Sequence, residues 1–189
     1  MTPEFMRIFV AVKLEEEKIV DRIINLQEDL AKAGLRAKFV EPENLHFTLK
    51  FIGEVPPETV EKVRRVLSEV SGTPFTLEMR GVGGFPSLSR PRVIWIGVRQ
   101  GDSMLIELSS SIEKILSEKA GIKRSSKEFH PHLTIARVKG FVPAAARKLL
   151  EEHKDTVFGD IRVDRFLLMR SRLTPRGPIY TVIESYALQ

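Results

Sequence analysis

The chain has 189 residues and a formal net charge of +5, and 42% of its residues are hydrophobic while 29% are charged. These values are ordinary for a folded globular protein and exclude a disordered chain, and no apolar run is long enough to span a bilayer. The sequence has no cysteine, which excludes disulfides, zinc sites built on thiolates and cysteine nucleophiles.

The charge balance favours an anionic partner. The sequence isoelectric point is about 9.6, and basic side chains gain affinity for nucleic acid when its phosphates release their counterions. Asparagine and glutamine are scarce, which is typical of thermophilic proteins when Lys, Arg and Glu abound. Residues 1–5 resemble a vector-derived remnant ahead of a start at Met6. We expect a cytoplasmic monomer that uses no cofactor.

The first half of the chain predicts alternating strands and helices. Short β-branched or apolar runs indicate the strands, and apolar residues at helical spacing, such as Ile19, Ile23 and Leu26, indicate the helices. The expected elements are a strand at 7–13, a helix ending near Gly34, a strand at 46–52, a helix at 57–70 and a strand at 75–82.

The second half repeats this order. The expected elements are a strand at 92–98, a helix at 103–119, a strand at 132–138, a helix at 143–153, a strand at 161–169 and a closing strand at 179–188. An offset of 86 positions moves Phe9 onto Trp95, His46 onto His132 and Pro74 onto Asp160. One constant offset for three landmarks indicates an internal repeat.

The repeat predicts an α+β fold with two pseudo-symmetric lobes. Each lobe would be an antiparallel sheet with helices on its outer face, and the two sheets would face each other across an active-site cleft. Because we see no linker that would separate independent domains, we expect residues 6–189 to form a single bilobal domain.

Two matching segments lie inside the repeat: His46-Phe47-Thr48-Leu49 and His132-Leu133-Thr134-Ile135. Side chains alternate across a strand, so each histidine shares a face with the threonine two positions later. The apolar residues between them, and Phe51 beyond the first segment, are expected on the buried face. A single segment of this kind would most simply be half-buried strand, but a pair at the repeat offset favours one shared site.

Two histidines and two threonines suit the opening of a cyclic phosphodiester. That reaction needs a base to activate water and an acid to protonate the departing sugar oxygen, and histidine does both near neutral pH. Threonine hydroxyls can donate to the phosphate oxygens as their negative charge grows. A carboxylate beside each histidine would favour a metal or a catalytic triad, so threonine favours an anion bound between the histidines.

These segments resemble the paired motifs of the 2H phosphoesterase superfamily. The flanking residues 43–49, 129–137 and 171–180 are similar to its RNA 2′,3′-cyclic phosphodiesterase branch, historically called 2′-5′ RNA ligase, and the likeness covers nearly the whole chain from Met6. The resemblance implies hydrolysis of RNA 2′,3′-cyclic phosphate ends to 2′-phosphomonoesters without a metal. It also implies a reverse ligase activity that seals a cyclic phosphate to a 5′-hydroxyl.

The resemblance also implies the role of each site residue. His46 would protonate the leaving 3′ oxygen and His132 would activate the water, an assignment that the near-symmetry of the sequence does not make by itself. Arg137 matches an arginine usual in this branch, which implies a phosphate contact. Its strand parity opposes that of His132 and Thr134, so a bulge or the strand end would have to turn it into the cleft.

Other residues admit more than one interpretation. His130 and His132 together invite a metal site, but no Asp, Glu or Cys accompanies them at ligand spacing, so a structural role for His130 is favoured. Trp95 is expected in the core. Phe85 is the better candidate for base stacking, because glycines and a proline should keep it in a loop.

Two other functions remain open at the level of sequence. The protein could open a small cyclic nucleotide such as ADP-ribose 1″,2″-cyclic phosphate, which would need less basic surface beyond the cleft. It could also be a non-catalytic module that binds RNA ends, although two intact histidine segments argue against this. Comparing kcat/KM for an oligonucleotide and a mononucleotide would distinguish an RNA enzyme from one that acts on small cyclic nucleotides. A single-turnover assay would distinguish an enzyme from a binding module.

Overall fold

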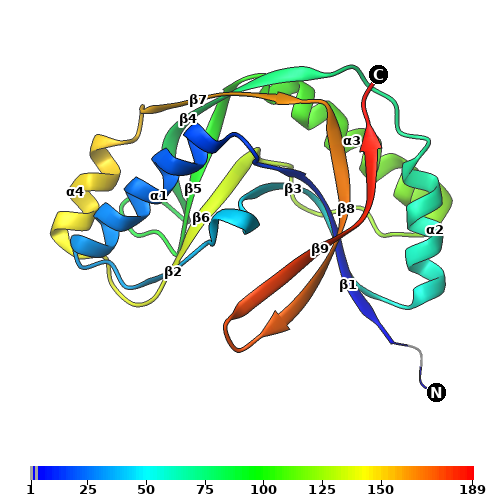
Figure 1. Ribbon diagram of the computed structural model, residues 1–189, viewed down its shortest axis with the longest axis horizontal. Coiled ribbons are helices and arrows are strands. Elements are labelled where there is room, and N and C mark those ends of the chain that lie inside the picture. The colour runs from blue at the N-terminus through cyan, green and yellow to red at the C-terminus, as the bar shows by residue number, and fades with distance from the viewer. Residues whose placement is uncertain (1, 3) are drawn as a thin grey trace.

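The computed structural model describes residue 2 and residues 4–189 (Figure 1). Of the expected vector-derived stretch 1–5, residues 1 and 3 therefore lie outside the described residues. The elements in chain order are β1 (Met6–Lys13), α1 (Glu17–Lys32), β2 (Ala37–Phe39), the 3-10 helix η1 (Pro42–Asn44), β3 (His46–Val55), α2 (Pro57–Leu67), β4 (Phe75–Phe85), β5 (Val93–Gln100), α3 (Asp102–Ala120), β6 (His132–Val138), α4 (Ala144–Glu152), β7 (Val157–Val163), β8 (Arg165–Thr174) and β9 (Gly177–Ala187).

The strands form one antiparallel sheet with a narrow centre. Its order is β7-β4-β5-β6-β3-β1-β8-β9, and β2 pairs with β6. At the centre, β3 meets β6 at the pair Phe47 and Leu133. The sheet therefore divides there into a first lobe of β3, β1, β8 and β9 and a second lobe of β6, β5, β4 and β7. The α+β class with two lobes is confirmed, and the two sheets are joined at this pair.

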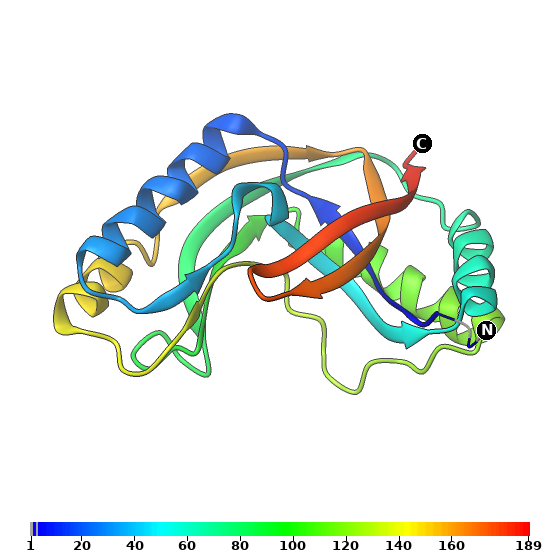
Figure 2. The same cartoon turned by 60° about the horizontal axis from the view of Figure 1, so that its bottom comes forward.

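Each lobe carries two helices on its outer face (Figures 1 and 2). Helices α2 and α3 pack against each other and against β1 and β3, whereas α1 and α4 pack together against β6, β7 and β4. Helix α1 follows β1 in the chain but covers the lobe that contains β6 and β7. Each lobe is thus assembled from both halves of the sequence repeat, and the two halves are interlocked.

The repeat offset relates the strand pairings of the two lobes. In the first lobe β1 pairs with β8, and Phe9 lies opposite Met169. In the second lobe β5 pairs with β4, and Trp95 lies opposite Gly83. Both residues of the second pair lie 86 positions from their counterparts in the first. The lobes therefore correspond in register over residues 7–10 of β1 and 93–96 of β5, beyond which the pairing of β4 with β5 shifts.

The helices form where the spacing of apolar residues predicted them. Helix α1 buries Ile19, Ile23, Leu26 and Leu30 against one core cluster that extends through both lobes. Burying an aliphatic side chain of this size contributes about 1.5–3 kcal/mol, which fixes the helices on the sheet. Among the described residues, none of the helices is long and apolar enough to cross a membrane.

The structure corrects three expectations about the strands. The strand expected at 161–169 is two strands, because the chain turns at Asp164, whose carbonyl accepts the N–H of Leu188. Strand β2 was not predicted, since three residues are too few to give a pattern. Strand β4 continues to Phe85, which lies opposite Val93 of β5, so Phe85 belongs to a strand and not to a loop.

Candidate active site

A cavity of about 490 Å³ lies where the two lobes meet, and all five predicted site residues line it: His46, Thr48, His132, Thr134 and Arg137. The first two come from β3 and the other three from β6, the two strands at the centre of the sheet. The structure therefore brings the two sequence segments to one place.

Strand alternation explains how the histidines and threonines reach the cavity. In β3 the intervening residues Phe47 and Leu49 are buried, while His46 and Thr48 lie on the opposite face. In β6 the intervening Leu133 is likewise buried. The apolar residues anchor each strand in the core, so the polar face that they leave is held in a fixed position.

A bulge in each of the two strands turns one further residue into the cavity. Leu49 is an extra residue where β3 pairs with β1, and Ile135 is an extra residue where β6 pairs with β5. Each insertion reverses the alternation beyond it. Phe51 and Arg137 consequently line the cavity instead of lying on the core face. The parity argument against Arg137 and the expected burial of Phe51, which is 50% exposed, are both wrong for this reason.

Buried helix side chains stabilise the two bulges. The hydroxyl of Ser109 on α3 donates to the carbonyl of Leu49 at 2.9 Å, and the amide nitrogen of Gln27 on α1 donates to the carbonyl of Ile135 at 2.9 Å. A bulge leaves its extra residue unpaired in the ladder, and a buried carbonyl without a donor is costly. These two hydrogen bonds, together with the one that the N–H of Val40 donates to the carbonyl of Ile135 at 2.9 Å, satisfy both carbonyls.

Both catalytic candidates have the same ring orientation. The Nδ1 atom of His46 lies 2.6 Å from the carbonyl oxygen of Asn44, and Nδ1 of His132 lies 2.5 Å from that of His130. A carbonyl oxygen only accepts, so Nδ1 carries the hydrogen in each ring. The neutral ring then has its lone pair on Nε2, and this nitrogen remains for proton transfer.

Thr48 contacts the reactive nitrogen of the first histidine. Its Oγ1 atom lies 2.9 Å from Nε2 of His46, so the hydroxyl donates to the lone pair of the neutral ring. When the ring is protonated, Nε2 becomes a donor and the threonine hydroxyl is free to turn to another acceptor. The pair can therefore present two donors to an anion when the ring is protonated, whereas in the neutral state the hydroxyl hydrogen is engaged by Nε2.

Burial lowers the pKa of both histidines. For His46 the loss of hydration is the main cause, with the positive charge of Arg137 acting in the same direction and the hydrogen bond to Asn44 opposing it. For His132 the loss of hydration also dominates and the bond to His130 opposes it. Both pKa values lie below the ordinary 6.5. Burial therefore favours neutral rings, and a bound anion would favour protonation.

Aromatic rings hold the first histidine in place. The ring of His46 lies 5.2 Å from that of Phe9 and 5.3 Å, edge-on, from that of Tyr180 on β9. Burial raises the pKa of the Tyr180 hydroxyl, which keeps it neutral. Tyr180 lies within the C-terminal segment that carries the family resemblance, and this was its only signal in the sequence.

The second histidine has an equivalent aromatic support. The ring of Phe85 lies 5.0 Å, edge-on, from that of His132, and the ring of Trp95 lies 6.2 Å from it. Phe85 is therefore packed against the imidazole and is not the free stacking residue expected from a loop. Trp95, which was expected in the core, is only half-buried.

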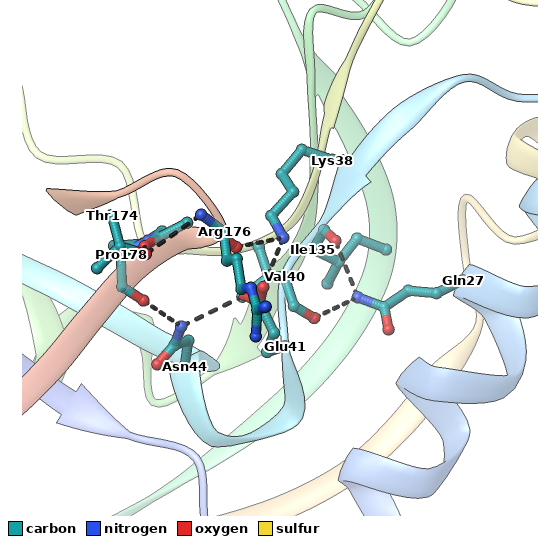
Figure 3. A network of polar contacts seen from close by, with 10 residues as sticks. Gln27, Lys38, Val40, Glu41, Asn44, Ile135, Thr174, Arg176 and Pro178 are labelled. Carbon is teal, nitrogen blue, oxygen red and sulfur yellow. Dashed lines mark hydrogen bonds and ion pairs between the residues drawn. The ribbon is translucent and has the colours of Figure 1, made fainter.

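A polar network at the mouth of the cavity fixes the segment before β3 (Figure 3). The amide nitrogen of Asn44 donates to the carbonyl of Pro178 in the β8–β9 hairpin at 3.2 Å and to Glu41 at 3.3 Å. Lys38 forms an ion pair with Glu41 and donates to the carbonyl of Arg176 at 3.4 Å. The hairpin tip is thereby fastened to the segment whose Asn44 carbonyl orients His46.

The cavity is lined by two basic residues in addition to Arg137, which the sequence predicted. Arg7 lies with its guanidinium carbon 4.9 Å from the centre of the Phe51 ring, and Arg7, Lys38 and Arg137 all line the cavity. Glu41 is the acidic residue among them and is paired with Lys38. The cavity can therefore hold an anion together with a flat, partly apolar group.

The histidine pair does not extend into a metal-binding cluster. Within residues 4–189, no group of three or more His, Cys, Asp or Glu side chains is arranged to hold a metal ion. His130 packs its ring edge-on against Trp95 at 5.0 Å and supplies its carbonyl to His132. These contacts agree with the structural role favoured for it.

Comparison with known proteins identifies the class. A family model described as LigT like phosphoesterase matches the chain twice, over residues 12–95 and 97–180. A protein of Archaeoglobus fulgidus named RNA 2′,3′-cyclic phosphodiesterase is 41% identical over 176 residues, covering 93% of this chain and 96% of that protein. One of Aquifex aeolicus with the same name is 36% identical over 186 residues, covering 97% and 96%.

Solved structures give the same result for the fold. E. coli LigT complexed with 3′-AMP superposes with a TM-score of 0.78 at 28% identity, covering 98% of this chain and 99% of that one. TT0787 of Thermus thermophilus superposes with a TM-score of 0.75 at 33% identity, covering 97% and 98%. The two-lobed fold and its matches are those of a phosphoesterase. The chain belongs to the LigT-like phosphoesterase family.

Proposed function

We propose that this protein hydrolyses RNA 2′,3′-cyclic phosphodiester ends to 2′-phosphomonoesters by acid–base catalysis with two histidines. The observation that carries the proposal is the pair His46 and His132, which line one cavity with Nδ1 bonded to a carbonyl and Nε2 left for proton transfer. The names of the curated relatives support the same substrate.

In the proposed reaction a water oxygen bonds to phosphorus while the bond from phosphorus to the 3′ oxygen breaks. His132 accepts the proton of the water at Nε2, and His46 donates its Nε2 proton to the departing 3′ oxygen. The phosphate remains on the 2′ oxygen, and the proton count balances. With a 5′-hydroxyl in place of water, the same two groups would form a 2′-5′ linkage, which is the proposed ligase activity.

The remaining site residues are proposed to bind the phosphate. Thr48 and Thr134 would donate their hydroxyls to its non-bridging oxygens, where negative charge increases in the transition state. Arg137, turned into the cavity by the bulge, would add a charge-assisted hydrogen bond. The chemistry of these groups supports catalysis without a metal.

The proposal treats residues 6–189 as one domain that acts as a monomer in the cytoplasm. Both histidine segments come from the same chain, so a single copy supplies a full pair of acid and base. The core cluster extends through both lobes, which supports one folding unit.

The test is incubation of an RNA oligonucleotide that ends in a 2′,3′-cyclic phosphate, in the presence of excess EDTA. We expect conversion to a single product that co-elutes with a synthetic 2′-phosphate standard and not with the 3′-phosphate standard. A 3′-phosphate product, or activity that returns only when a divalent ion is added, would contradict the proposed mechanism.

A further inference from the structure

The second lobe contains a cavity that the proposed reaction does not use. It has a volume of about 710 Å³ and is lined by strands β4 and β5, the start of α3 and the segment that leads into β6. Its walls include Trp95, Gly81, Gly97, Ile106 and His130, and it shares no lining residue with the cavity that holds the two histidines. We call it the Trp95 cavity.

The repeat shows that this space is filled in the other lobe. In the first lobe, β1 and β8 bury a small apolar cluster made of Phe9, Ala11, Leu167 and Met169. At the repeat offset of 86 positions, the second lobe has instead Trp95, Gly97, Gly81 and Gly83. Three side chains are thus absent from the second lobe, and two of the three glycines, Gly81 and Gly97, line the cavity.

The glycines make room for an indole ring. A Cβ atom added at Gly83 would lie 2.2 Å from Trp95 Cη2, which is not possible without moving the ring. One added at Gly97 would lie 3.1 Å from a backbone oxygen and 3.2 Å from the same ring. The absence of side chains at these positions is therefore required by the place that Trp95 takes.

The position of the indole leaves a buried hydrogen-bond donor unpaired. Its Nε1 is buried and has no hydrogen-bond partner among the described residues. A buried donor without an acceptor costs about 1–3 kcal/mol, and the phenyl ring of the equivalent Phe9 avoids this cost. The indole therefore leaves one donor unpaired that a phenylalanine at this position would not have.

The cavity begins beside the proposed catalytic base. The ring of His130, which lines the cavity, lies 5.8 Å from that of His132, and the ring of Trp95 lies 6.2 Å from it. A group bound against Trp95 would therefore be a close neighbour of the phosphate under attack. In an RNA strand, the nucleotide next to the cyclic end is such a close neighbour of the reacting phosphate.

We propose that the Trp95 cavity binds the base of the second nucleotide of the RNA, counted from its cyclic end. This inference rests on the proposed function. Aromatic rings stack on unpaired RNA bases without strong sequence preference. Arg80 and Lys154 line the cavity and can share their positive charge between an internucleotide phosphate and their ion-pair partners, Glu78 at 3.8 Å and Glu151 at 3.0 Å. Asp102 and Glu128 can accept hydrogen bonds from base amino groups or ribose hydroxyls.

The experiment compares a dinucleotide and a mononucleotide, both ending in a 2′,3′-cyclic phosphate, in two matched variants. Ile106→Glu places a negative charge at the cavity wall, and Ile179→Glu places the same charge on β9, at a residue that lines neither cavity. The two isoleucines are similarly exposed, at 41% and 44%. The variants therefore differ in where the charge lies and not in its size.

The wild-type protein should prefer the dinucleotide by about tenfold in kcat/KM, the worth of one stacked base. Ile106→Glu should remove most of that preference while the rate with the mononucleotide stays within about twofold, the range of an ordinary surface substitution. Ile179→Glu should leave the preference intact. Equal loss on both substrates, or no loss on either, would overturn the inference.

A second readout does not depend on turnover. Trp95 is the only tryptophan of the chain, so the fluorescence comes from a wall of this cavity. A dinucleotide ending in a 2′-phosphate should quench it more strongly than a mononucleotide 2′-phosphate, whose effect is limited to the neighbouring His132, 6.2 Å from the indole. If neither cyclic substrate were hydrolysed, the proposed function would fail, and the quenching would still decide for or against the cavity as a base site. Unchanged emission with the dinucleotide would exclude it.

Discussion

Lys50 and Glu113 form an ion pair that fastens the bulge of β3 to helix α3. Nζ of Lys50 lies 3.0 Å from a carboxylate oxygen of Glu113, and the lysine side chain is only 4% exposed. The ammonium group also donates to the carbonyl of Lys123 at 2.8 Å and to the hydroxyl of Ser125 at 3.0 Å. The bulge therefore also holds the segment that leads to His132.

Lys50→Ala should lower the free energy of unfolding by about 3 kcal/mol, because it leaves a partly buried carboxylate without its partner. Thermal or urea unfolding measures this loss. The double variant Lys50→Met with Glu113→Leu should recover most of the stability, since no charge then remains unpaired. If the double variant were as unstable as the single one, packing and not charge would explain the effect.

His46→Ala and His132→Ala should each lower kcat by about 10²–10⁴, the usual contribution of a positioned acid or base. Steady-state kinetics on an RNA with a cyclic phosphate end measures this, with circular dichroism as the check that each variant folds. Near-full activity in either variant would remove that histidine from the mechanism.

Thr48→Val should lower kcat by less, about 10- to 100-fold, because it removes one donor to the phosphate and keeps the shape of the side chain. KM should change little, since the lost interaction grows with charge in the transition state. Thr134→Val is the matched variant in the other segment and should behave alike. A large rise in KM with unchanged kcat would indicate ordinary ground-state binding instead.

The profile of kcat/KM against pH should be bell-shaped with its maximum below pH 6.5. The productive form has one neutral and one protonated histidine, and burial places the pKa of both below the ordinary 6.5. A bound phosphate stabilises the protonated rings, so the kcat profile should lie at higher pH.

The stability of the fold limits the acid side of this experiment. The pKa of both histidines is lower in the folded chain than in the unfolded chain. As the pH falls below 6.5 the unfolded chain therefore takes up protons first, and the free energy of unfolding decreases as the pH decreases. Rates should therefore be measured only where circular dichroism shows a folded protein. A flat profile over the folded range would contradict acid–base catalysis by two histidines.

Gln27→Met should lower activity although Gln27 does not line the active-site cavity. Its side chain donates to the carbonyl of Ile135, so its loss should unsettle the bulge that turns Arg137 inward. We expect higher KM, because phosphate binding weakens, and a kcat/KM profile displaced to higher pH, because the positive charge of Arg137 then lowers the pKa of the two histidines less. If Arg137→Met added a further full loss on top of Gln27→Met, the two residues would act independently.

The sequence predicted the central residues of the site because they follow strand alternation. His46 and His132 each lie next to buried apolar residues, and the repeat makes them equivalent. Phe51 and Arg137 could not be placed in this way, since a single inserted residue reverses the alternation and depends on the partner strand. Phe51 and Arg137 are equivalent at the offset of 86 positions, so the expectation that Arg137 contacts the phosphate could have placed Phe51 at the cavity as well, although strand alternation placed it in the core.

The sequence also predicted the class of the fold but not which strand joins which lobe. An offset shows that two segments are alike, and it does not show whether they pair with near or distant parts of the chain. Strands β7 and β8 therefore appeared as one element, although they lie at opposite parts of the sheet.

The interlocked lobes have a consequence for the synthesis of the protein. The first lobe needs β8 and β9, and the second needs β7, and all three strands lie in the last part of the chain, from Val157 to Ala187. A nascent chain therefore cannot complete either lobe before residues 157–187 have been made. The helices and inner strands keep apolar faces exposed until these three strands leave the ribosome, so the two lobes must fold together.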